Sequence, residues 1–207
     1  MASTVNARIP LSLLEAIRRI DTPTDPTDTE YVTELRNKRF GLSDTVYTQI
    51  RRYSEALKRG QRIPFAEAEG LGTLIGRRPD AAELFEKAGH ILADAIYQSI
   101  SPTKRGSIKA LPGFISRPMA LKQVRIASER YFEGTLERTG SFLSLKVIDS
   151  VTVNGSPGSA GCAFYETAFR QVLKSLVDAG DQIDHVHCAQ RGEGVCEWRA
   201  ECRGRAH

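Results

Sequence analysis

Hydrophobic residues recur at three- and four-residue steps through the first half of the chain, a spacing that predicts helices. The clearest repeat runs from Leu42 to Leu57, with Ser43 placed as N-cap and Gly60 as the stop. The same spacing predicts further helices over 10–20, 29–38, 64–75 and from 80 to about 96. Prolines, aspartates and threonines in 21–28 predict a loop after the first helix.

A second break in the pattern falls at 76–80. We place a boundary here, between a helical N-terminal region over 1–78 and a main domain over 79–205. Asp80 and Glu83 resemble a capping box, which would start the long helix of the main domain.

The hydrophobic period changes in the last third of the chain. The segment 104–135 predicts one or two helices, broken around Pro112 and Pro118. Beyond it the pattern predicts a strand over 142–153, a helix from Cys162, and a hairpin with strands over 183–190 and 194–202. The expected class is therefore α+β, with helices packed on an antiparallel sheet and preceded by the helical N-terminal region.

Composition narrows the class of protein. The 207 residues are 41% hydrophobic and 26% charged, as in an ordinary globular protein. No apolar run approaches the roughly 18 residues that span a bilayer, and the N-terminus does not resemble a secretory signal. We therefore expect a cytoplasmic protein without a membrane span. In a reducing compartment its cysteines favour metal binding over disulfides.

Charge is unevenly distributed. The stretch 36–62 holds eight basic residues against Asp44 and Glu55, for a charge of +6. This pattern is typical of a solvated helix face, and it also suits an acidic partner. Because the helices over 44–59 and 64–75 are joined by a short turn, a helix-turn-helix that binds nucleic acid is one alternative.

Three of the four cysteines suggest a metal site. Cys188 and Cys196 fall on opposing strands of the predicted hairpin, and Cys162 opens the helix before it. Cys202 lies on the same strand as Cys196, roughly 20 Å away at about 3.3 Å per residue, and cannot share an ion with it. The competing interpretation is that the thiols are small buried hydrophobes.

The fourth ligand stays open at this point. His185, His187, Asp184 and water are the candidates. Strict strand alternation places Asp184 and Val186 on the face of Cys188, which disfavours His185 unless a bulge intervenes.

Three segments carry a resemblance to a known family: 142–151, 161–165 and 187–198. Together they resemble the 4-vinyl reductase-like domain, which shares a superfamily with TRAPP-type vesicle-tethering subunits and is similar to the sensor domains of aromatic-catabolism activators. The resemblance covers about 80–203. It implies a TRAPP-like fold, often a homodimer, with a zinc held by a helix-start cysteine, a hairpin cysteine pair and a glutamate.

Mapped onto this chain, the resemblance assigns the zinc ligands to Cys162, Cys188 and Cys196, with His185 at the glutamate position. The zinc would be structural, since four protein ligands would close it. The resemblance also implies a hydrophobic pocket beside the zinc. Its candidate walls are Phe114, Tyr131, Phe132, Phe142, Phe164, Phe169 and Trp198, although aromatics at such spacing are commonly plain core.

The implied function is binding or sensing of a hydrophobic, aromatic or tetrapyrrole molecule. No phosphate-binding glycine loop and no nucleophile elbow is convincing, so we do not expect an enzyme. One alternative is an accessory or catalytic role in bacteriochlorophyll 4-vinyl reduction, as the family's name suggests. The other is a DNA-binding transcriptional regulator with a ligand-sensing domain.

Overall fold

The computed structural model describes residues 4–23, 40–153 and 159–202. Within them lie seven α-helices: α1 (Arg8–Asp21), α4 (Asp44–Lys58), α5 (Phe65–Gly76), α6 (Ala81–Ser99), α7 (Pro102–Ala110), α8 (Gly113–Tyr131) and α9 (Cys162–Val177). A two-stranded antiparallel sheet joins β1 (Thr4–Asn6) to β2 (Arg62–Pro64). The predicted helix over 29–38, and with it Arg36 and Lys38, lies outside the described residues.

A four-stranded antiparallel sheet in the order β3-β4-β6-β5 forms the second half of the fold. Its strands are β3 (Thr135–Thr139), β4 (Phe142–Val147), β5 (Ile183–His187) and β6 (Cys196–Glu201), and a short 3-10 turn, η2 (Ala189–Arg191), follows β5. The predicted mixed α+β class is confirmed.

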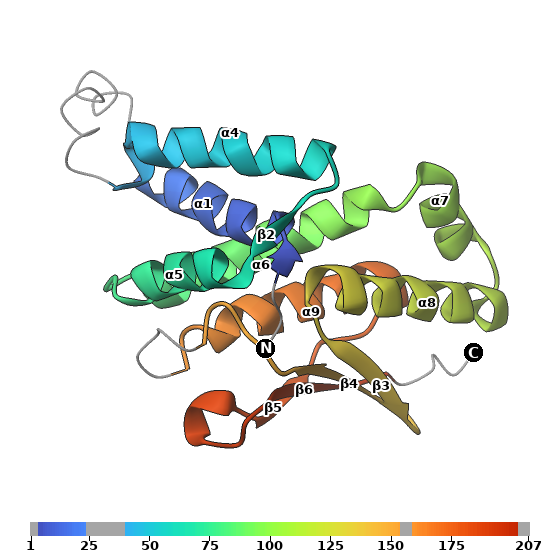
Figure 1. The fold of residues 1–207 in the computed structure, drawn as a ribbon. Coiled ribbons are helices and arrows are strands. Elements are labelled where there is room, and N and C mark those ends of the chain that lie inside the picture. The colour runs from blue at the N-terminus through green and yellow to red at the C-terminus, as the bar shows by residue number, and fades with distance from the viewer. Residues whose placement is uncertain (1–3, 24–39, 154–158, 203–207) are drawn as a thin grey trace.

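The elements stack in layers (Figure 1). α8 and α9 lie over the sheet, α6 packs on α9, and α1 separates α6 from α4. Gly89 permits the close approach of α6 to α9, because a Cβ there would lie 2.6 Å from the carbonyl oxygen of Phe164. One hydrophobic cluster includes residues from both sides of position 78, such as Ile17 and Phe85. The domain boundary at that position stays a prediction.

Most of the predicted helices are confirmed. The predicted N-cap at Ser43 is confirmed as well. Ser43 caps α4 by accepting a hydrogen bond from the amide of Val46 at 3.3 Å. The capping box at Asp80 is wrong: that side chain makes no cap hydrogen bond, because both of its oxygens accept from Arg78 at 2.8 Å. Arg78 also holds the buried Asp21 at the end of α1, so it is not a solvated turn residue.

Two further predictions need correction: the helix break at Pro118 and the end of the strand predicted over 142–153. The chain breaks at Pro112 as predicted, but Pro118 lies inside α8. The predicted strand over 142–153 ends at Val147, and Val151 is buried in a turn against α5. A Cβ on Gly72 of α5 would lie 2.0 Å from the carbonyl oxygen of Val151, so only glycine allows this contact.

Short strands were the elements that the sequence pattern did not predict. β2 falls between α4 and α5, where a helix-turn-helix would have only a turn, and it pairs with β1 in register Val5 to Ile63. A strand of three residues is too short to show a period. Nucleic-acid binding by these helices stays a prediction.

Candidate metal centre

The structure brings Cys162, His185, Cys188 and Cys196 together. One ligand atom from each lies within 4.8 Å of every other, and the three cysteines are buried. Cys162 is the first residue of α9, Cys188 follows β5, and Cys196 begins β6. These are the four residues that the family resemblance selected.

A bulge in β5 brings His185 into the group. His185 pairs with Trp198 of β6, but His187 pairs with Glu197, so the register shifts between them and Val186 is extra. Strict alternation would have turned His185 away from the face of Cys188. One extra residue reverses the facing of all side chains that follow it, because the side-chain period of a strand is two.

The geometry fits a single tetrahedral ion. Bonds of about 2.3 Å to thiolate sulfur at the tetrahedral angle place two sulfurs about 3.8 Å apart. The Sγ atoms of Cys162 and Cys188 are 3.7 Å apart. Three thiolates and one imidazole are a typical donor set for structural zinc, and they exclude magnesium and calcium, which prefer oxygen.

The surroundings of the ligands support the same interpretation. The buried Nε2 of His185 has no hydrogen-bond partner within the described residues, a cost that a bond to a metal would remove. The ring of His185 stacks on Trp198, with centroids 5.1 Å apart and an interplanar angle of 8°. The amide of Ala189 donates to Sγ of Cys196 at 3.4 Å, as an amide does to a thiolate.

The thiols of Cys162 and Cys196 shift each other's pKa in opposite directions. A hydrogen bond from Cys162, reinforced by the Ala189 amide, lowers the pKa of Cys196 from its ordinary value. The same hydrogen bond, together with burial, raises the pKa of Cys162. A bound cation would favour the thiolate form of all three cysteines.

The remaining ligand candidates lie outside this group. His187 is half-exposed and faces the carboxylates of Glu193 at 3.7 Å and Glu197 at 4.0 Å. Asp184 is exposed on β5. Cys202, which directly follows β6, is buried but absent from the cluster, as its separation from Cys196 along the strand predicts, and burial raises its pKa.

The candidate pocket residues separate into two sets. Tyr131, Phe132, Phe164, Phe169 and Trp198 are buried in the core, whereas Phe142 is 40% exposed and Phe114 79% exposed. Of the seven, Phe114 lines a groove on the surface of the molecule.

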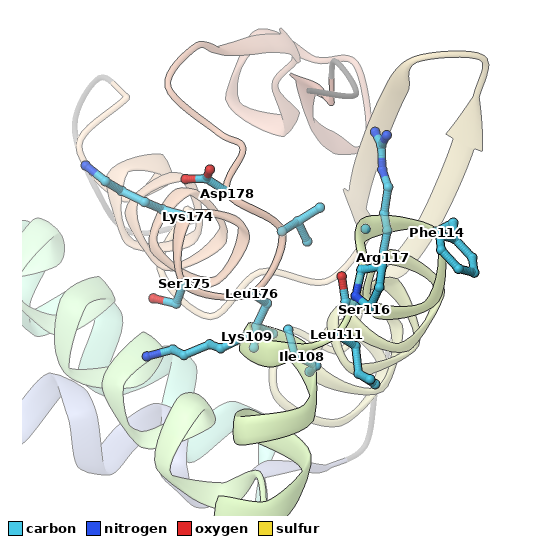
Figure 2. A pocket seen from close by; sticks show the side chains of 13 residues that line it. Ile108, Lys109, Leu111, Phe114, Ser116, Arg117, Lys174, Ser175, Leu176 and Asp178 are labelled. Atoms are coloured by element: carbon cyan, nitrogen blue, oxygen red, sulfur yellow. The ribbon is translucent and has the colours of Figure 1, made fainter. Parts of the chain in front are cut away.

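That groove has a volume of about 910 Å³ and lies between α7, the start of α8 and the end of α9 (Figure 2). Ile108, Leu111 and Leu176 give it apolar walls, and Lys109 and Lys174 place two cations beside it. Such a volume is in the range of small-molecule sites. Sequence reasoning missed this place, because its lining segments, 108–117 and 174–178, are far apart in the chain and carry no motif.

Some of the basic residues in the stretch 36–62 form ion pairs within the fold. Arg52 pairs with Glu67 at 2.9 Å, and Arg62 pairs with Glu133 at 2.7 Å. Glu67 also accepts from Tyr53 at 2.7 Å. Two of the basic residues therefore connect elements of the fold, and an acidic partner for the stretch stays a prediction.

Comparison with known proteins gives no relative. No family model matches this chain, and no curated protein and no solved structure matches it at a significant level. No helix in the described residues has both the length and the apolar character to cross a membrane.

Proposed function

We propose that this protein is not an enzyme but binds a hydrophobic or aromatic small molecule, and that a structural zinc stabilises its fold. The observation that carries the proposal is the convergence of Cys162, His185, Cys188 and Cys196 on one point. Four protein donors leave no open coordination position, which is the pattern of structural rather than catalytic zinc. The resemblance to 4-vinyl reductase-like domains supports the same assignment.

Zinc would connect two parts of the fold that are separate in the sequence. Cys162 belongs to α9, and the other three ligands belong to the β5–β6 hairpin. Since the hairpin strand β5 is at the edge of the sheet, it has a strand neighbour on one side only. A metal bound here holds the edge of the sheet against the start of the helix.

The groove supports the binding part of the proposal. Its apolar walls suit a hydrophobic or aromatic body, and Lys109 and Lys174 suit a carboxylate on the ligand. A tetrapyrrole with its carboxylate side chains is one such molecule, and a role in bacteriochlorophyll 4-vinyl reduction would use the same place. A homodimer in the cytoplasm stays an expectation.

Metal analysis tests the zinc. Protein purified with zinc should hold one equivalent by mass spectrometry under native conditions, and Cys188→Ser and Cys196→Ser should hold almost none. Their free energy of unfolding should fall by several kcal/mol, because metal binding is coupled to folding. Cys202→Ser is the matched control: it is also buried, lies outside the cluster, and should keep its equivalent. Full metal retention in the cluster variants would overturn the zinc assignment.

A thermal-shift screen tests the ligand. Aromatic acids and tetrapyrroles should include a compound that stabilises the protein by about 2.7 kcal/mol at 100 times its dissociation constant. Ser175→Trp, which fills the groove, should abolish that shift and keep the zinc. If no compound stabilises the wild type, the binding part of the proposal is wrong.

A further inference from the structure

The connection between α7 and α8 differs in charge from the rest of the molecule. From Ala95 to Ser128 the chain has no acidic residue, and six basic residues give it a charge of +6. They are Lys104, Arg105, Lys109, Arg117, Lys122 and Arg125. None of the six forms an ion pair with any residue that the structure describes. We name residues 102–126 the basic corner.

The tip of the basic corner is apolar and exposed. Every residue from 109 to 115 is exposed, including Leu111 at 38%, Phe114 at 79% and Ile115 at 41%. Phe114 has the highest exposed fraction of any large hydrophobic side chain in the described residues. Figure 2 shows its ring pointing away from the groove, so the groove does not bury it.

The helices behind the tip contribute cations to the same corner. α7 buries none of its residues, and Lys104 and Lys109 are exposed on it. On α8, Lys122 and Arg125 are exposed, as is Ile126 at 41%. Figure 1 places α7 and the start of α8 at one edge of the molecule, away from α1 and α4. A flat partner can therefore reach the corner without touching the N-terminal helices.

From this arrangement we infer that the basic corner docks on a membrane surface that contains anionic lipid. Exposed aromatic and aliphatic side chains enter the boundary between headgroups and acyl chains, and the surrounding lysines and arginines bind the lipid phosphates. Leu111, Phe114 and Ile115 supply the first element, and the exposed cations supply the second: Lys104, Lys109, Lys122 and Arg125. The protein lies on such a membrane and does not span it.

Two other occupants fit less well. A second copy at a two-fold interface would bring the same +6 surface against itself, and like charges repel. A nucleic acid would satisfy the cations, and a base could stack on Phe114, but phosphodiester and sugar offer nothing to Leu111 and Ile115. An anionic bilayer satisfies both the charge and the apolar tip.

Vesicle co-sedimentation of the full chain tests the inference. The wild type should bind vesicles of phosphatidylcholine with 30% phosphatidylserine, should not bind phosphatidylcholine alone, and should be released by raising salt from 50 to 500 mM. Each cation near an anionic surface strengthens binding about five-fold. The double variant Lys122→Glu and Arg125→Glu should therefore bind at least about 25-fold more weakly. Phe114→Ser with Ile115→Ser should weaken binding at least about ten-fold.

The matched control changes the net charge by the same amount at a different surface. Arg51→Glu with Lys58→Glu, both exposed on α4, also changes the net charge by four units and should bind within about two-fold of wild type. Equal loss in the control would show that net charge alone drives binding and would overturn the inference. So would absence of binding by the wild type, or binding to single-stranded DNA through the corner without binding to vesicles. Circular dichroism should show all variants folded, since every substituted side chain is exposed.

Discussion

The candidate metal centre and the basic corner lie at opposite ends of the molecule (Figure 1) and differ in what holds their side chains in place. At the metal centre, three buried cysteines and a histidine stacked on Trp198 are fixed by the packing around them. At the corner, α7 buries nothing and the tip from 109 to 115 is exposed throughout. Substitutions at the first site should therefore change the fold, and substitutions at the second should change only what the protein binds.

A pair of aromatic substitutions gives the largest contrast. Trp198 is fully buried between Tyr165, with ring centroids 5.7 Å apart, and His185. Trp198→Ala should lower the free energy of unfolding by about 3–5 kcal/mol, because it leaves a cavity. Phe114→Ala, at an exposed position, should change it by less than about 0.5 kcal/mol. Urea unfolding followed by circular dichroism measures both, and similar losses would contradict the comparison.

Pro118→Ala tests whether a substitution in the basic corner can raise the free energy of unfolding. Pro118 lies in the second turn of α8, where it cannot donate to the carbonyl of Phe114 and is exposed. Alanine restores that hydrogen bond and should raise the free energy of unfolding by about 1–3 kcal/mol. Lys122→Ala on the same helix should leave stability nearly unchanged. A destabilised Pro118→Ala protein would mean that the proline is needed to shape the corner.

The smallest expected effect is the dependence of stability on pH that comes from the ion pair between Arg78 and Asp80. Two hydrogen bonds from Arg78 hold the pKa of Asp80 below its ordinary value, so Asp80 contributes stability above its unfolded pKa and loses it as pH falls through the folded one. Asp80→Asn should therefore be about 1 kcal/mol less stable than wild type at pH 7 and equal to it near pH 2. With no carboxylate from 95 to 128, a corner variant such as Lys122→Gln should follow the wild-type pH curve. Calorimetry from pH 2 to 7 measures this, and a difference that persists at pH 2 would exclude the ion pair as its cause.

The sequence could predict a feature when the residues that determine it lie close together in the chain. The cap of Ser43 and the repeat in α4 lie within one helix, and both are confirmed. Cys202 could be excluded because it lies at the far end of β6 from Cys196, directly after the last residue of the strand, which is simple strand geometry. In contrast, Asp80 was misassigned because its partner Arg78 binds it together with Asp21, 57 residues before Arg78.

The bulge at Val186 shows the limit most clearly. Alternation alone disfavoured His185, and nothing in the sequence around Val186 marks an extra residue. The family resemblance mapped its glutamate ligand onto His185, and the structure brings His185 into the cluster, where periodicity had placed it on the other face. The groove beside Leu176 had no local signal at all, because three helices form it. The run without acidic residues from 95 to 128 was visible in the sequence, but its importance depends on an exposure that only the structure gives.

Trp198 has a consequence for spectroscopy. It is the only tryptophan of the chain, and its indole stacks directly on the imidazole of His185. Tryptophan fluorescence therefore has a single emitter, and that emitter touches His185 of the candidate metal centre. An imidazole bound to zinc and a free imidazole quench an adjacent indole to different extents. The emission of Trp198 should thus report whether the metal is bound, without a dye or a label.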